Sequence, residues 1–212
     1  MNYTIPVSLS FTKKITFVQL IFIITGFIPV TCIALNVMQF IPLHQTAFFV
    51  AIPGFLLILC LGLKYTEDGK TALKGWLAGI IAVALYDLAR LFFILGAGWD
   101  DFVPHIGDWI LNKEGHNGLI AYLWRYIGNG GGMGIAFMFL IKKGYPNKNI
   151  SAKGLFYGLF IFTNLMFTLS VSPNGQLMMF KITALTFTGS LVGHIVYGWV
   201  LGWVAYRFLK DK

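Results

Sequence analysis

Long apolar segments alternate with short polar ones along the chain. Six of the apolar segments have the roughly 20 residues that a helix needs to cross a bilayer core of about 30 Å. They cover residues 16–39, 46–64, 75–98, 118–141, 154–172 and 178–207. This pattern predicts an all-α membrane protein with six transmembrane helices, in which residues 1–212 form a single integral membrane domain.

Composition supports this interpretation and excludes several classes of function. Hydrophobic residues make up 57% of the 212 residues and charged ones only 11%, whereas soluble domains carry about 25% charged residues. We therefore exclude soluble enzymes. The net charge of +8 does not indicate a nucleic-acid partner, because the basic residues follow the loops between apolar segments.

The distribution of these basic residues predicts the orientation. On one side, which holds both chain ends, the loops contain Lys13, Lys14, Lys64, Lys70, Lys74, Lys142, Lys143, Lys148, Lys153, Arg207, Lys210 and Lys212. The loops on the opposite side contain only Lys113. Because cytoplasmic loops are enriched in Lys and Arg, we expect both termini in the cytoplasm (N-in/C-in).

The 99–117 loop on the opposite side is acidic and has a helical pattern. Its apolar residues recur at helical spacing: Trp99, Phe102, Val103, Ile106, Trp109 and Ile110. Between them and after them lie the carboxylates Asp100, Asp101, Asp108 and Glu114. This pattern predicts a short amphipathic helix over 100–111 that lies on the outer membrane surface, with Asp101 as its cap.

Two pairs of predicted spans share a glycine pattern. The third and fifth spans open with Lys74-Gly75-x-x-x-Gly79 and Lys153-Gly154-x-x-x-Gly158. The fourth and sixth align through Gly130-x-x-x-Gly134 and Gly198-x-x-x-Gly202. We interpret the two pairs as copies of one helical hairpin, repeated in parallel. The alternative is that any two membrane helices with such glycines align equally well.

Three charged residues lie inside the predicted spans. Asp87 and Arg90 are in the third span and Arg125 is in the fourth. A charge at the bilayer centre costs about 2.5–3.5 kcal/mol, so such residues are usually paired and functional. Counting inward from the outer ends places them, with Asn129, at matched depth, roughly 10–17 Å below the outer surface. We expect these four side chains to form one cluster.

The charges of this cluster do not balance, because two arginines meet one aspartate and arginine keeps its proton. An anion would complete the balance: a substrate carboxylate or phosphate, a lipid head group, or an acidic residue of the 99–117 loop. The structural alternative is that Asp87 pairs with Arg90 or Arg125 only to hold the helices together, while the spare arginine extends outward.

The sixth span adds two candidate site residues, His194 and Tyr197, on a polar stripe along one face. Such stripes also occur as hydrogen bonds between helices, and a single histidine is often a packing residue. Beside Arg125, five glycines crowd residues 128–134. They permit either close helix packing or local unwinding around a cavity.

The stretches AVALYDLARLFF (82–93) and GSLVGHIVYGWVLG (189–202) carry a resemblance. They are similar to a loose group of small multi-pass bacterial membrane proteins without assigned function. The members share an A-x-D-x-x-R helix and a closing G-H-[LI]-V-Y-G-x-V-L-G helix. The resemblance implies a location in the bacterial inner membrane, and it implies no activity.

From these features we expect a protein that binds or transports a small anionic or amphiphilic ligand through an outward-facing cavity. The cavity would be lined by Asp87, Arg90, Arg125, Asn129, His194 and Tyr197. The alternatives are an intramembrane enzyme for a lipid or phosphate-bearing substrate, with His194 as general base, and an accessory subunit that docks another membrane protein. Membrane lipid is an expected partner, and no motif points to a metal or a cofactor.

Overall fold

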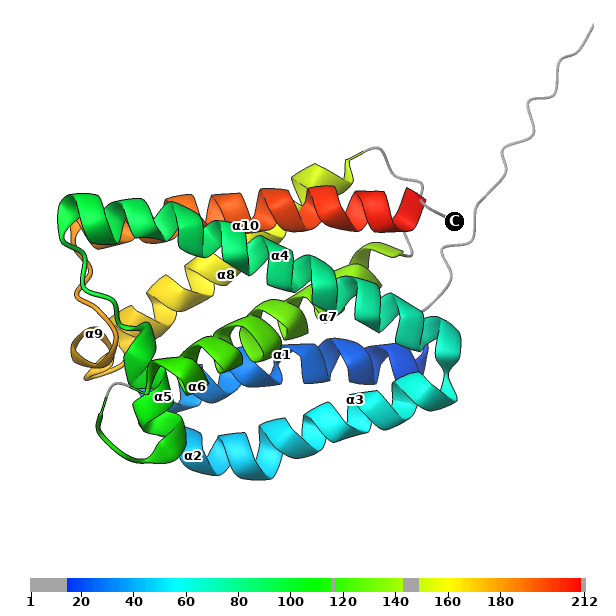
Figure 1. Ribbon diagram of the computed structural model, residues 1–212, viewed down its shortest axis with the longest axis horizontal. Coiled ribbons are helices and arrows are strands. Elements are labelled where there is room, and N and C mark those ends of the chain that lie inside the picture. Colours follow the sequence, from blue (N-terminus) through cyan, green and yellow to red (C-terminus); the bar gives the residue numbers. More distant parts are fainter. Residues whose placement is uncertain (1–14, 116, 143–148, 211–212) are drawn as a thin grey trace, which may run out of the picture.

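The computed structural model describes residues 15–115, 117–142 and 149–210, and within these ranges the chain is helical, without strands (Figure 1). Five of the basic residues on which the predicted orientation is based lie outside the described ranges: Lys13, Lys14, Lys143, Lys148 and Lys212.

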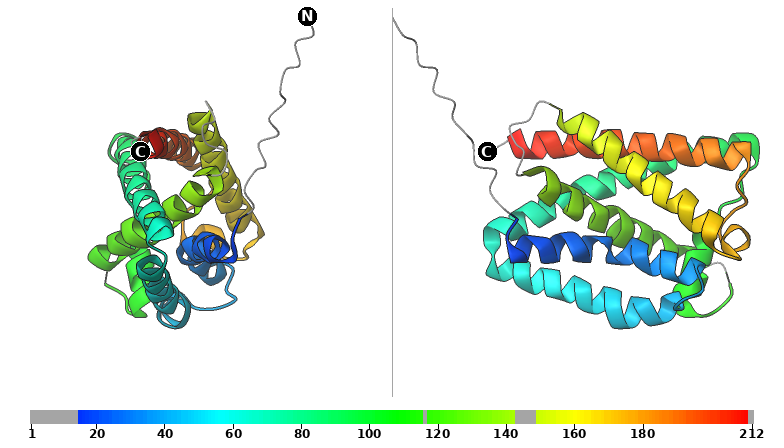
Figure 2. Two further views of the ribbon diagram at one scale, coloured as in Figure 1. Left: turned by 90° about the vertical axis from the view of Figure 1, so that its right-hand side faces the viewer. Right: turned by 180° about the vertical axis from the view of Figure 1, so that it is seen from behind.

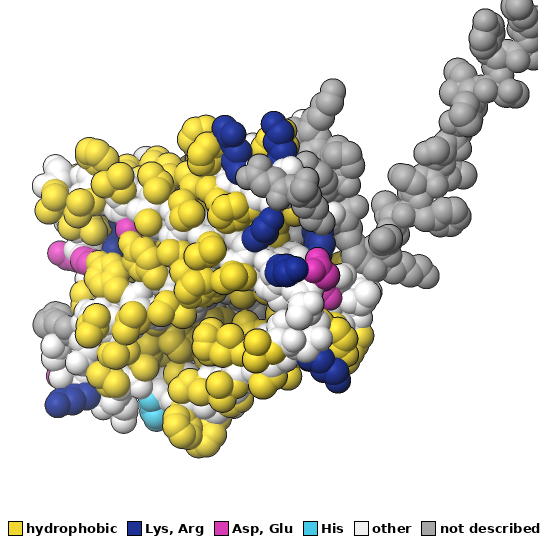
Figure 3. All heavy atoms as spheres, turned by 45° about the vertical axis from the view of Figure 1, so that its right-hand side comes forward, with side chains coloured by type: hydrophobic (Ala, Val, Ile, Leu, Met, Phe, Trp, Pro, Cys, Tyr) yellow, Lys and Arg dark blue, Asp and Glu magenta, His cyan; other side chains and the backbone are white. Residues whose placement is uncertain are grey.

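Five helical segments are long and apolar enough to cross a membrane. They are α1 (Phe17–Val37), the run Leu43–Lys64, α4 (Thr66–Ala97), α8 (Ile150–Val171) and α10 (Ala184–Lys210). The run Leu43–Lys64 consists of α2 (Leu43–Thr46), the π-helical turn η1 (Ala47–Ala51) and α3 (Ile52–Lys64). Hydrophobic side chains cover the flank of the molecule, and Lys and Arg gather toward the end with the chain termini (Figure 3). These features indicate a membrane protein.

A further helical run occupies the fourth predicted span. It consists of α6 (Gly118–Leu123), the π-helical turn η2 (Trp124–Gly130) and α7 (Gly131–Lys142). Seen from the end of the bundle, α7 lies at the centre of the other helices (Figure 2). It packs mainly on α4 and α1.

Two helix ends differ from the predicted spans. Helix α4 begins nine residues earlier than residue 75, because polar residues such as Glu67 and Asp68 form its first turn. Helix α10 begins later than residue 178, at Ala184, because the Thr183 hydroxyl oxygen accepts a hydrogen bond from the N–H of Thr186 at 3.2 Å. A threonine at this position starts a helix by satisfying a free N–H group. The short helix α9 (Gly175–Met178) precedes it.

The glycine run beside Arg125 packs closely against neighbouring helices. The helix stays continuous, widened only in the π-helical turn η2. A Cβ atom at Gly130 or Gly134 would press against α4, one at Gly132 against α1, and one at Gly131 against the Trp76 ring. Close packing is therefore confirmed, because a central helix with neighbours on several sides needs small residues on several faces, and the departure from a regular α-helix is limited to η2.

The same type of contact joins α8 to α10. Gly134 fits against Gly75 and Gly79 of α4, and in the same way Gly198 fits against Gly154 and Gly158 of α8. By these contacts Gly134 corresponds to Gly198. The predicted alignment, which paired Gly130 with Gly198, is therefore displaced by one helical turn, because a four-residue glycine spacing fits equally well after a shift of four residues.

The predicted amphipathic helix exists as α5 (Val103–Leu111). It starts after residue 100 because the Asp101 carboxylate accepts a hydrogen bond from the Val103 N–H at 3.0 Å, while Phe102 is the cap residue. Its apolar face is covered by protein, which differs from the expected placement on a lipid surface. Trp99, Phe102, Val103 and Ile106 pack in one core with Leu43, Ala121, Leu169 and Phe180.

The glycine contacts lead to a prediction for stability. In Gly79→Ala the new methyl group overlaps the carbonyl group of Gly130, so α4 must move away from the η2–α7 run. We expect a loss of about 1–3 kcal/mol, the usual cost of overpacking. Gly96→Ala on the same helix is the matched control, because a Cβ atom there meets no atom within 4 Å. Thermal unfolding in detergent should show a lower Tm for Gly79→Ala alone, and equal Tm values would contradict the contact.

Candidate functional site

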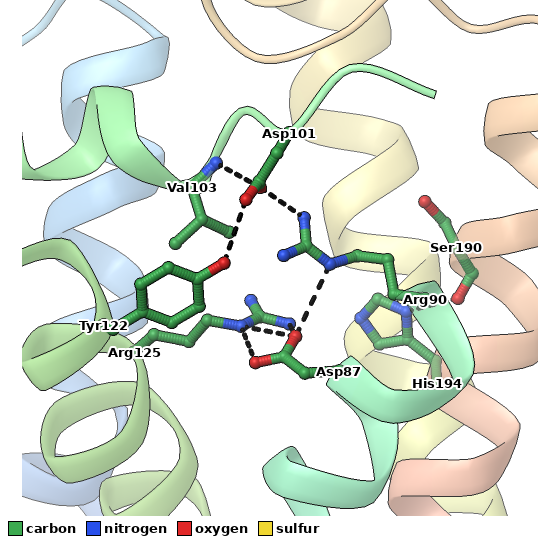
Figure 4. Close-up of polar contacts among 8 residues, drawn as sticks. All are labelled: Asp87, Arg90, Asp101, Val103, Tyr122, Arg125, Ser190 and His194. Atoms are coloured by element: carbon green, nitrogen blue, oxygen red, sulfur yellow. Dashed lines mark hydrogen bonds and ion pairs between the residues drawn. The ribbon is translucent and has the colours of Figure 1, made fainter. Parts of the chain in front are cut away.

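The charged residues predicted inside the membrane meet near the end of the bundle that holds α5. Asp87 and Arg90 lie one turn apart on α4, Arg125 lies on η2, and Asp101 lies between α4 and α5 (Figure 4). Arg90 is among the largest fully buried side chains, with 2% of its surface exposed. Burial of this extent is unfavourable for a cation unless acidic groups surround it.

Asp87 and Arg125 form a two-pronged ion pair. The Arg125 Nε lies 2.9 Å from both carboxylate oxygens, and Nη2 lies 2.6 Å from Oδ1. Both side chains are largely buried. Bidentate pairing of a carboxylate with a guanidinium is the strongest ordinary ion-pair geometry, and here it joins α4 to η2.

Arg90 forms an ion pair with a carboxylate outside its own helix, that of Asp101. Its Nη1 donates to Asp101 Oδ1 at 2.9 Å, while its Nε lies 3.5 Å from Asp87 Oδ1. The hydroxyl of Tyr122 donates to the other oxygen of Asp101 at 2.9 Å. Two cations and two anions now balance, so the spare positive charge is met by an acidic residue of the 99–117 loop, one of the alternatives left open by the sequence.

The surroundings of Asp101 change its acidity. Burial raises the pKa of the carboxyl, but the Arg90 guanidinium and the hydrogen bonds from the Val103 N–H and Tyr122 lower it more. The pKa of Asp101 therefore lies below its usual value, and the carboxylate stays ionised at neutral pH.

An aromatic residue that the sequence analysis did not select connects the charges to His194. The Tyr86 ring lies 4.8 Å from the guanidinium carbon of Arg125 and 5.1 Å, edge to face, from the His194 ring. Contacts of this kind stabilise a cation in apolar surroundings. The position of Tyr86 beside Asp87, and that of Tyr122 one turn before Arg125, were the only signals for these residues in the sequence.

Asn129 and Tyr197 do not join the ion pairs. Asn129 lies one turn deeper than Arg125, and its short side chain ends in a cavity, where no hydrogen bond joins it to another described residue. The Tyr197 hydroxyl donates to the carbonyl oxygen of Gly130 at 3.5 Å. The expected cluster is therefore divided into an ion-pair network at the α5 end of the bundle and a cavity next to it.

This cavity has a volume of about 380 Å³ and lies between α1 and α8. Its inner wall holds Val83, Tyr86, Arg125, Asn129, Met133, His194 and Tyr197, and one end of it is lined by Phe102, Ile106 and Met179. Side chains of α1 and α8 form the remaining walls, and the exposed ones among them are Thr31, Phe160 and Asn164.

The cavity exists because its two lateral helices pack on different partners. Helix α8 packs mainly on α10 and α1 packs mainly on α7, and from behind α8 runs obliquely to α1 (Figure 2). At the outer end the Ser172 hydroxyl donates to the Val37 carbonyl oxygen and links the two helices. With exposed side chains on both rims, the cavity opens sideways, between α1 and α8.

A second cavity of about 270 Å³ lies on the other side of α1, between α1, α3 and the α6–η2 run. No charged side chain lines it. Within the described ranges no group of three His, Cys, Asp or Glu side chains could hold a metal ion. Comparison with protein-family models, with curated proteins and with solved structures found no match for this chain.

The ion pair leads to a second prediction. In Asp87→Asn the Arg125 charge stays buried without its main partner, and we expect a loss of about 3–5 kcal/mol of stability. Replacing both residues by apolar ones (Asp87→Leu with Arg125→Met) should restore most of it, because no buried charge is then unpaired. Denaturant unfolding of the wild type and both variants measures the difference, and an unchanged stability in Asp87→Asn would refute the role of the pair.

Asp101 leads to a prediction about pH. Since its folded-state pKa is lowered, the Asp101–Arg90 pair stabilises the protein above the unfolded pKa of about 4 and loses this effect as pH falls through the lower folded value. Asp101→Asn should therefore lower the Tm at pH 7, and its difference from the wild type should shrink below about pH 4. The exposed Asp100→Asn is the control, and a difference independent of pH would contradict the assignment.

Proposed function

We propose that this chain binds an amphiphilic molecule in the cavity between α1 and α8 and carries it across or along the membrane. One observation supports this most. The cavity is walled by apolar side chains, has a few polar groups at its inner wall, and has its exposed rim residues on helices that are apolar enough to face lipid. Small-molecule sites commonly combine such apolar walls with a few polar groups in a volume of about 300–1,000 Å³.

The proposal includes six spans with both termini in the cytoplasm of a bacterium. In support, the run Gly118–Lys142 has the length of a span and is flanked by α4 and α1. The basic residues Lys64, Lys142 and Lys210 are the last residues of α3, α7 and α10, at helix ends that the orientation assigns to the cytoplasm. The inner-membrane location rests on the sequence resemblance. The equivalent glycine contacts of Gly134 and Gly198 favour a duplicated hairpin.

An amphiphilic ligand suits the site better than a small free anion. Both arginines already have carboxylate partners, so neither offers an unbalanced charge. The outer end is lined by Phe102 and Ile106, so we now propose a lateral entrance in place of the outward one that the sequence suggested. The enzyme alternative is less favoured, because His194 packs against aromatic rings and its Nδ1 bonds a backbone carbonyl, an arrangement suited to binding.

Mass spectrometry of molecules that copurify with the protein in native nanodiscs tests this proposal. We expect one amphiphile to be enriched over the bulk lipid in the wild type. It should be lost in Thr31→Trp and Ala34→Trp, because an indole at either position obstructs the cavity. Leu95→Trp is the matched control, since Leu95 is 77% exposed and remote from the cavity lining. Equal enrichment in all variants, or none in the wild type, would contradict the proposal.

A further inference from the structure

The amide of Asn129 is the first sign of what the cavity binds. Asn129 is only 8% exposed and lines the cavity, and its carbonyl oxygen Oδ1 is buried without a hydrogen-bond partner in the described part of the chain. A buried amide without a partner is unfavourable, most of all in a membrane protein, where water cannot replace the missing bond. The Nδ2 of the same amide is not fully buried and makes no hydrogen bond to another described residue, so it can donate to an oxygen of a ligand in the cavity.

His194 adds an acceptor on the same wall. Its Nδ1 lies 2.7 Å from the carbonyl oxygen of Ser190. Because a carbonyl oxygen only accepts, Nδ1 carries the proton, and Nε2 of the neutral ring is then a free acceptor. Nε2 has no hydrogen-bond partner within the described part of the chain, and the residue lines the cavity. A ligand group that donates to this nitrogen would satisfy it.

The charges near the cavity argue for a neutral ligand. Arg125 lines the cavity, but Asp87 occupies its Nε and Nη2. Asp101 balances Arg90 in the same way. An anion bound here would add an unbalanced negative charge to a neutral group of four residues in surroundings of low dielectric, which is unfavourable.

We propose that the ligand is a neutral lipid alcohol, that is, a long hydrocarbon chain with a hydroxyl head. The hydroxyl proton is donated to His194 Nε2, and the hydroxyl oxygen accepts a hydrogen bond from the Asn129 amide. The chain lies along α1 and α8 and leaves through the lateral opening toward the lipid. This inference rests on the proposed function and adds the class of head group.

The test is equilibrium binding of tritiated 1-hexadecanol to the full chain in nanodiscs. Hexadecanoate at neutral pH and hexadecane serve as competitors with the same chain and a different head. We expect hexadecanol to bind about tenfold more tightly than either competitor, because only the alcohol can both accept from Asn129 Nδ2 and donate to His194 Nε2. Asn129→Leu and His194→Phe should each reduce this preference.

Two controls separate binding from folding. Thr163→Val on the same helix removes a hydroxyl that already donates to the Leu159 carbonyl oxygen at 2.9 Å and does not line the cavity, so the preference for the alcohol should stay unchanged. Asn129→Leu should raise the Tm of the ligand-free protein, because it removes a buried polar group without a partner. A purely structural role for Asn129 would instead lower the Tm and leave the preference unchanged, which would overturn the inference.

The remaining outcomes distinguish this inference from the proposed function. Tighter binding of hexadecanoate would overturn the neutral head group while leaving an amphiphile site in place. Equal binding of hexadecane and hexadecanol would show that Asn129 and His194 do not recognise the hydroxyl head. That result would overturn this inference and leave the proposed function in place. No saturable binding of any of the three probes would overturn both.

Discussion

The bidentate ion pair between Asp87 and Arg125 is the constraint around which the bundle is arranged. A buried charge in apolar surroundings must have its partner, so the two residues hold α4 and the α6–η2–α7 run in one register. The glycine contacts below the pair, at Gly75 and Gly79, depend on the same register. A shift by one turn would separate the charges and place side chains where only glycine fits.

The ion pair between Arg90 and Asp101 connects the Asp87–Arg125 pair to the segment that leads into α5. Arg90 cannot be satisfied by Asp87 alone, because Asp87 already accepts three hydrogen bonds from Arg125. Asp101 supplies the missing charge, and its carboxylate also holds the first turn of α5. The position of Phe102 and Ile106 at the outer end of the cavity is therefore tied to the charges within the membrane. Any movement that opens this end must disturb the Arg90–Asp101 pair.

The cavity follows from how the glycines distribute the helices. Close contacts bind α8 to α10 and α1 to α7, and neither pair brings α1 and α8 together along their length. The space between them is lined by apolar side chains except at Asn129, His194 and their neighbours. Polar groups without partners are disfavoured in a membrane interior, and the ligand that we propose for this cavity would donate to His194 and accept from Asn129.

The sequence by itself determined the apolar helices, the pairing of charges at matched depth on α4 and η2, and the importance of Gly75, Gly79 and Gly134. Hydropathy, helical spacing and depth are properties of the local chain, so they can be read from it. Only the tertiary structure decided that Asp101 balances Arg90, that the apolar face of α5 packs on protein, that Asn129 faces a cavity, and that the cavity opens sideways. Each of these depends on which segments meet in space, and a run of apolar residues favours burial against lipid and against protein equally.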